Sequence, residues 1–219
     1  MNETSQSAPE RTGIPSILRR FARRRIDTEQ CELCSAELAQ LHSHLLDPAK
    51  RQIVCACEAC ALLFCGRTGA SYLKIPKRIC LLVDVQMTDL DWESLMIPIN
   101  LAFFYRDSAS SRMVAMYPSP AGATESLLSL EAWDGISAQN PTLQTMESDV
   151  EAFLVNRVSK IPEYYIVPID ECFRLVGILR MHWKGLSGGT EVWAHIRSFF
   201  ADLQARGTSR NAHPEVMHA

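Results

Sequence analysis

Hydrophobic and polar positions fall into short blocks along most of the chain, and these blocks predict strands in its middle part. Residues 99–107 and 112–118 are apolar and rich in β-forming residues, and the polar turn SASS lies between them. We therefore predict a β-hairpin at 99–118. Further strands are expected at 72–75, 78–85 and 163–170, whereas 149–158 fits either a strand or a helix.

Helical spacing dominates the last third of the chain. Apolar residues recur at helical steps in 171–183 and again in 191–205, where Thr190 is the expected N-cap. Shorter helices are expected at 90–96, capped by Thr88 or Asp89, and within 124–140. Together these patterns predict an α+β fold in which a mainly antiparallel sheet carries helices concentrated at its C-terminal end.

Ahead of these blocks lies a segment, residues 29–67, that is unusually rich in cysteine. Two C-x2-C pairs, Cys31 with Cys34 and Cys57 with Cys60, are separated by twenty-two residues. Strands at 41–47 and 51–57, joined by a turn at DPAK, would present the pairs as the two knuckles of a zinc ribbon. Thiolates are soft, anionic ligands that suit Zn²⁺, so the spacing predicts a zinc site at these four cysteines. Metal binding would then supply much of the folding energy of so short a segment.

Three other side chains of this segment are alternative ligands. Cys55 could replace Cys57 as the fourth ligand, although the C-x2-C spacing favours Cys57, or it could be a small buried residue. His42 and His44 would share one strand face, but with four thiolates available we interpret them as surface histidines or as supports outside the site. The remaining cysteines are interpreted as packed thiols: Cys65, Cys80 and Cys172.

The composition divides the chain into four parts. A basic arm at 1–28 holds six arginines against three acidic residues and is expected to be disordered, either as a solvated tail or as a docking arm for an acidic partner. The zinc-ribbon-like module at 29–67 follows, then the α+β domain at 70–206, then a polar tail at 207–219 that is also expected to be disordered.

Charge and hydropathy indicate which partners and which cellular compartment to expect. A net charge of −3 and a pI near 6.1 give no general attraction to nucleic acid. The sequence has no apolar run of the length that a membrane span requires and no apolar core of a signal peptide, so a cytoplasmic protein is expected. In that compartment cysteines serve more often as metal ligands or free thiols than as disulfides.

Sequence motifs of the common enzyme classes are missing. The chain contains no Walker loop, dinucleotide fingerprint, nucleophile elbow or H-E-x-x-H pair. Two segments, 117–126 and the glycine-rich 183–189, could be binding loops or ordinary connections. Convergence of Glu125, Arg157 and Lys184 in one pocket would favour an enzyme, and otherwise a non-catalytic protein is expected.

Several segments in order resemble an uncharacterised bacterial domain family whose genes tend to lie beside those of high-affinity, oxygen-tolerant, actinobacterial-type NiFe-hydrogenases. The segments are CELC, CACEAC, IPINLAFFYR, MVAMYPSPAGATESLL, VEAFLVNR, YYIVPIDECFRLVG and WKGLSGG, within residues 29–205. The resemblance implies an accessory protein that assists hydrogenase assembly, maturation or electron connection through contacts with hydrogenase subunits. Some such operons also encode rubredoxin-like proteins, so an electron-transfer protein with iron in the cysteine site is the alternative. Because the second cysteine pair lacks the C-P-x-C-G pattern of rubredoxins, zinc is favoured over iron.

Overall fold

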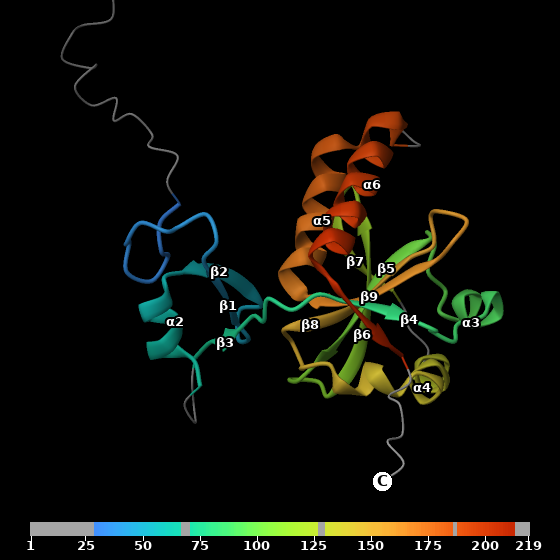
Figure 1. Cartoon of the computed structure of the whole chain (residues 1–219), viewed down its shortest axis with the longest axis horizontal. Helices are drawn as coiled ribbons and strands as arrows, with labels where there is room; N and C mark the ends of the chain where they lie inside the picture. Colours follow the sequence, from blue (N-terminus) through green and yellow to red (C-terminus); the bar gives the residue numbers. More distant parts are fainter. Residues whose placement is uncertain (1–28, 67–70, 127–129, 186–187, 213–219) are drawn as a thin grey trace, which may run out of the picture.

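The computed structural model describes residues 29–66, 71–126, 130–185 and 188–212, and it contains a small unit beside a larger α+β domain (Figure 1). The predicted basic arm and residues 213–219 of the predicted tail lie outside the described residues. The α+β class and the grouping of four cysteines near the N-terminus are both confirmed.

The small unit is built on a β-hairpin. Strand β1 (Ser43–Asp47) pairs antiparallel with β2 (Gln52–Ala56), and the backbone N–H groups of Ala49 and Lys50 donate to Asp47 Oδ1 in the turn, each at 3.1 Å. A short strand, β3 (Leu73–Lys74), adds to the other edge of β1. Helix α2 (Glu58–Phe64) follows β2 directly. The strand expected at 72–75 therefore pairs within the small unit and not in the larger sheet.

Seven strands form the sheet of the larger domain. They are β4 (Cys80–Val83), β5 (Leu101–Asp107), β6 (Arg112–Ser119), β7 (Gly122–Glu125), β8 (Glu151–Asn156), β9 (Glu163–Pro168) and β10 (Thr208–Asn211). Their order is β10-β4-β9-β8-β5-β6-β7, and every neighbouring pair is antiparallel except β10 with β4. The hairpin predicted at 99–118 is confirmed as β5 and β6.

Helices cover both faces of this sheet (Figure 1). They are α3 (Asp89–Ser94), α4 (Leu130–Gln139), the 3-10 helix η1 (Pro141–Thr145), α5 (Ile169–His182) and α6 (Gly189–Arg206). Alternate residues of each strand point to opposite faces, so Phe103 and Tyr165 pack with α5 and α6. Phe104 and Phe153 pack instead with Trp133 of α4.

Strand β8 shows why residues 149–158 were ambiguous in sequence. All six residues of β8 are buried, because it lies between β9 and β5 and helices cover both of its faces. A strand buried on both faces has no polar alternation, and its apolar run cannot be distinguished from a buried helix by pattern alone.

Two expected helix starts are wrong. The segment 124–140 contains α4, but its first two residues, 124 and 125, belong to β7, which pairs with β6 across a tight turn in which Ser119 Oγ donates to Gly122 O at 2.9 Å. The possible binding loop at 117–126 is thus mostly strand and turn. Helix α6 begins at Gly189, one residue before the expected cap, and its N-cap is Gly188 with φ of 83°. The φ at position 188 is in the left-handed region, which glycine adopts more readily than threonine.

The expected disordered tail also requires correction, because β10 begins at residue 208. All four of its residues are exposed, and it is held to the sheet edge by main-chain pairing with β4. Its sequence, TSRN, has no apolar alternation from which a strand could be predicted.

The small unit packs directly on the larger domain. Leu46 of β1 and Ile75 after β3 belong to the same apolar core as α5 and α6. Arg51 donates to Asp107 Oδ1 of β5 at 2.6 Å, and the ring of His44 contacts Asp170 of α5, with Nδ1 2.6 Å from Oδ2. The cysteine segment is therefore held against α5 by both apolar and polar contacts.

The N-terminus of helix α3 is capped by a side chain, as the sequence predicts. Thr88 is its N-cap: Thr88 Oγ1 accepts from the Asp91 N–H at 3.1 Å, and Asp91 accepts from the Thr88 N–H at 2.8 Å. We expect Thr88→Ala to lower the free energy of unfolding by about 1 kcal/mol in urea denaturation, because the Asp91 N–H loses its side-chain acceptor at the start of the helix. Ser94→Ala at the other end of the helix is the control, and an equal loss in both variants would contradict the capping role.

Candidate metal centre

Cys31 and Cys34 lie on a tight turn that precedes the hairpin. The Ser35 N–H donates to Cys31 O at 2.7 Å, and the Cys31 N–H donates to Ala36 O at 2.8 Å. Ser35 has a φ of 62°, a left-handed conformation that closes the turn. This turn brings the two side chains of the first C-x2-C pair to the same side, as the sequence predicts for a metal knuckle.

The second pair is positioned by the start of a helix. Cys57 is the N-cap of α2 and Cys60 lies in its first turn, where the Ala61 N–H donates to Cys57 O at 2.9 Å. The zinc-ribbon expectation had the strand at 51–57 deliver Cys57 to a second knuckle, whereas a helix follows Cys57 directly, so the ribbon identity is not established. The segment EACALLF is rich in good helix formers and contains no β-branched residue, which favours the helix that sequence reasoning overlooked.

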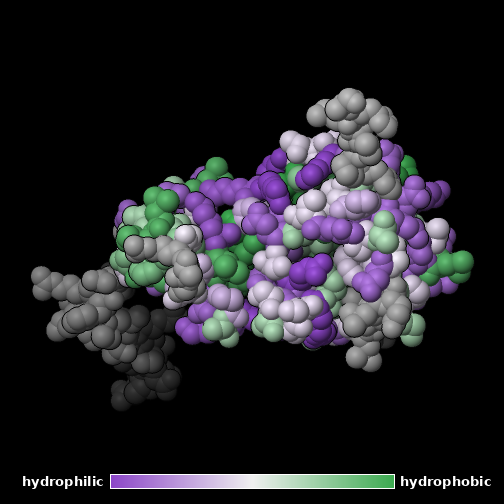
Figure 2. Space-filling model, turned by 90° about the horizontal axis from the view of Figure 1, so that it is seen from below, coloured by the Kyte–Doolittle hydropathy of each residue, from purple (hydrophilic) through white to green (hydrophobic). Residues whose placement is uncertain are grey.

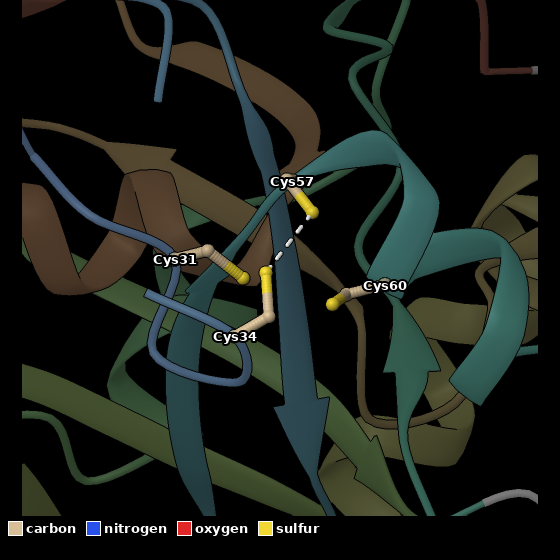
Figure 3. Close-up of side chains that lie close together, drawn as sticks. All are labelled: Cys31, Cys34, Cys57 and Cys60. Atoms are coloured by element: carbon tan, nitrogen blue, oxygen red, sulfur yellow. Dashed lines mark hydrogen bonds between the residues drawn. The ribbon is translucent and has the colours of Figure 1, made fainter. Parts of the chain in front are cut away.

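The four sulfur atoms of Cys31, Cys34, Cys57 and Cys60, called here the four-sulfur cluster, all lie within 4.8 Å of one another. Figure 3 shows their side chains pointing toward a common centre from the turn and from α2. Cys34 Sγ is 3.7 Å from Cys57 Sγ, and none of the four forms a disulfide. A tetrahedral zinc site with bonds near 2.3 Å would separate its sulfurs by about 3.8 Å. The arrangement therefore fits a single metal ion.

Electrostatics within the cluster also suit a cation. Burial opposes ionisation of Cys31, but backbone N–H groups of Cys57, Leu33 and Cys34 donate to its sulfur, and the net pKa falls to about 6. Burial and the neighbouring sulfurs of Cys34 and Cys57 raise the pKa of Cys60 to about 12. Four thiolates this close repel one another, and a metal cation between them removes that penalty.

The alternative ligands do not join the four-sulfur cluster. His42, His44 and Cys55 form a separate group whose ligand atoms lie within 4.8 Å of one another. Alternation along the hairpin explains the separation, since Leu45 and Val54 pack with Cys31, whereas His44 and Cys55 point to the opposite face. The pairing of His44 with Cys55 could have been predicted from the turn at DPAK, because this turn sets the register of the two strands.

Comparison with known proteins places the chain in a family. A family model described as "Family of unknown function (DUF5947)" matches residues 30–207. The chain belongs to the DUF5947 family. No curated protein and no solved structure matches the chain. The DUF5947 match spans both the small unit, with all four clustered cysteines, and the α+β domain up to Gly207.

Glu125, Arg157 and Lys184, the residues whose convergence would favour an enzyme, each form an ion pair with a different partner. Glu125 contacts Arg112 at 2.8 Å, Lys184 contacts Glu191 at 2.5 Å, and Arg157 pairs with Asp89. Residues 186–187 of the glycine-rich loop lie outside the described residues. A hollow of about 710 Å³ lies between α6 and the residues after β8, and Glu125, Arg157 and Lys184 are not among the residues that line it.

Within the described part of the chain, no helix is both long enough and apolar enough to cross a bilayer.

Proposed function

We propose that the chain is a non-catalytic, metal-binding accessory protein in which Cys31, Cys34, Cys57 and Cys60 hold structural Zn²⁺. The observation that carries the proposal is the four-sulfur cluster, whose ligands account for all four positions of a tetrahedral ion. A closed site of this kind has no open position for a substrate, and it stabilises the fold around it. The ion would join the turn at 31–35 to the start of α2.

The helix that begins at this site exposes apolar side chains that support a role in protein contacts. Leu62, Leu63 and Phe64 of α2 are 70%, 63% and 43% exposed, and Leu41 before β1 is 89% exposed. Figure 2 shows apolar surface gathered on the small unit. Exposed apolar side chains that cluster together are typical of interaction surfaces. Since Cys57 is the N-cap of α2 and Cys60 lies in its first turn, a bound ion would fix this surface in place.

The partner that we propose is a NiFe-hydrogenase undergoing assembly, maturation or electron connection, as the resemblance of the sequence segments implies. Anaerobic pull-down from an extract that expresses the hydrogenase genes tests this proposal. We expect hydrogenase subunits to be recovered with the wild-type chain and to be lost with the double variant Leu62→Asp, Leu63→Asp.

Leu90→Asp is the matched control for this pull-down, because Leu90 is 77% exposed on α3 in the larger domain. It is expected to retain the subunits. Recovery of the wild-type chain alone would contradict the proposed partner, and equal loss in both leucine variants would contradict the proposed surface.

A rubredoxin-like electron-transfer role is the second candidate, and the exposure of Cys34 favours it because electrons must enter close to the surface. Colour separates the two candidates, since ferric tetrathiolate is red and zinc tetrathiolate is colourless. A colourless protein that contains zinc after anaerobic purification would support the structural site, and a red, iron-containing protein would support electron transfer.

A further inference from the structure

A second group of ligand-type side chains lies on the opposite face of the hairpin from the four-sulfur cluster. His44 of β1 is paired in register with Cys55 of β2, and His42 comes two residues before His44. The ligand atoms of the three residues lie within 4.8 Å of one another. This face of the hairpin turns toward α5, where Asp170 contacts the His44 ring. The group is therefore enclosed between the small unit and the larger domain, with each member partly buried.

The two imidazole rings present the same nitrogen to each other. His42 Nε2 lies 3.1 Å from His44 Nε2, while each Nδ1 faces an oxygen acceptor on its other side. His44 Nδ1 is 2.6 Å from Asp170 Oδ2, and His42 Nδ1 is 3.0 Å from Ala39 O and 3.6 Å from Glu29 Oε2. A neutral ring that donates through Nδ1 carries a lone pair on Nε2. Two such lone pairs at this distance repel each other unless a proton or a metal cation lies between them.

The distances fit a metal ion. Two histidine ligands with bonds of 2.0–2.1 Å at a tetrahedral angle place their nitrogens about 3.3 Å apart, close to the 3.1 Å between the two Nε2 atoms. Asp170 accepting from His44 Nδ1 is the carboxylate support that metal-bound histidines commonly have, which fixes the ring and raises its basicity. Cys55 supplies a soft third ligand.

The surrounding charge also favours a cation. Three carboxylates face the group: Asp170 at His44, Glu29 near His42, and Glu32, whose Oε1 accepts from the Cys55 N–H at 2.7 Å. Lys77 is a neighbouring positive charge that acts on His44. Burial and the Glu32 and Glu29 carboxylates raise the pKa of the Cys55 thiol, an effect that a bound cation would reverse.

We propose that His42, His44 and Cys55 form a second metal site, which binds one divalent transition-metal ion through two imidazole nitrogens and one thiolate. Three protein ligands leave a fourth tetrahedral position open to water or to an incoming ligand, as in zinc sites that exchange ligands. This site differs from the closed four-sulfur cluster in both chemistry and accessibility, and it does not depend on what that cluster does. Asp170 is the positioning residue of the site.

Cobalt(II) titration of the full chain, with zinc retained in the four-sulfur cluster, tests this proposal. We expect uptake of cobalt without release of zinc, accompanied by visible d–d bands and a thiolate-to-cobalt charge-transfer band. His44→Ala and Cys55→Ser should lose this uptake. Cys65→Ser, a thiol of the same unit, and His195→Ala, from a separate histidine group on α6, should retain it.

Three outcomes would overturn the proposal. Cobalt uptake that is matched by zinc release and is retained in His44→Ala would place the ion in the four-sulfur cluster. Loss of uptake in His195→Ala alone would place it beside His182 and Glu191. No uptake by the wild type would mean that the two histidines share only a proton.

Asp170→Asn gives a test that does not remove a ligand. It preserves the size of the side chain but weakens the acceptor for His44 Nδ1, so we expect the same stoichiometry with affinity for cobalt reduced about 10- to 100-fold. Circular dichroism would establish that each variant remains folded. Unchanged affinity in Asp170→Asn would contradict metal binding through His44 Nε2.

Discussion

Removal of metal from the four-sulfur cluster is expected to unfold the small unit while the seven-stranded sheet stays folded. The apolar core around the cluster consists of few and mostly small residues, and two of them, Cys31 and Cys60, are themselves proposed ligands. Structural zinc contributes about 10–16 kcal/mol of binding free energy in small zinc-dependent units. Without it, the remaining core cannot offset the entropy of ordering the turn, the hairpin and α2.

Hydrogen exchange followed by mass spectrometry measures this effect on each segment separately. We expect Cys60→Ser, or chelation of the wild type, to abolish amide protection in β1, β2 and α2 and to leave β8 and β9 protected. Cys65→Ser is the matched control, because it removes a partly buried thiol of the same unit that lies outside the cluster. Retained protection of the hairpin in Cys60→Ser would show that packing against α5 suffices to fold the unit.

The second large effect is expected at Arg78, the partner of a buried carboxylate in the central strand β8. Glu151 is fully buried, and it accepts from Arg78 Nε at 2.5 Å, from Arg78 Nη2 at 2.6 Å, and from the Glu147 N–H at 2.9 Å. Hydrogen bonding to Glu151 raises the pKa of the Arg78 guanidinium above its usual value. We expect Arg78→Ala to lower the free energy of unfolding by about 3–5 kcal/mol, because it leaves a buried carboxylate without its counter-charge.

Urea denaturation of a double-mutant cycle isolates this interaction. Glu151→Gln keeps the shape of the side chain and removes its charge, so Arg78→Ala should cost much less in that background than in the wild type. A loss that is equal in both backgrounds would mean that Arg78 stabilises the fold by packing and not by neutralising Glu151.

Much of the fold could be predicted from the sequence because its signals are local. The β5–β6 hairpin follows from two apolar runs around a polar turn, and α5 and α6 follow from apolar residues at helical spacing. The convergence of the four cysteines was predicted in the same way, since each C-x2-C pair needs only one tight turn or helix start to bring its sulfurs together.

Features that depend on distant residues could not be predicted in this way. The Arg78–Glu151 pair forms only because the chain after β3 crosses beside β8, and the contact between His44 and Asp170 joins residues 126 positions apart. Strand β10 carries no apolar pattern and exists only because β4 offers it an edge. Hydrophobic periodicity contains no information about such partners, so the polar contacts between elements had to be found in three dimensions.

Metal content measured together with an absorption spectrum, after anaerobic purification of the full chain, tests the central claim most directly. The account predicts a colourless protein that contains zinc. Cys34→Ser should lose the zinc of the four-sulfur cluster, whereas Cys65→Ser should match the wild type. A red protein with iron in place of zinc, or a Cys34→Ser variant with undiminished metal content, would contradict a closed structural zinc site at Cys31, Cys34, Cys57 and Cys60.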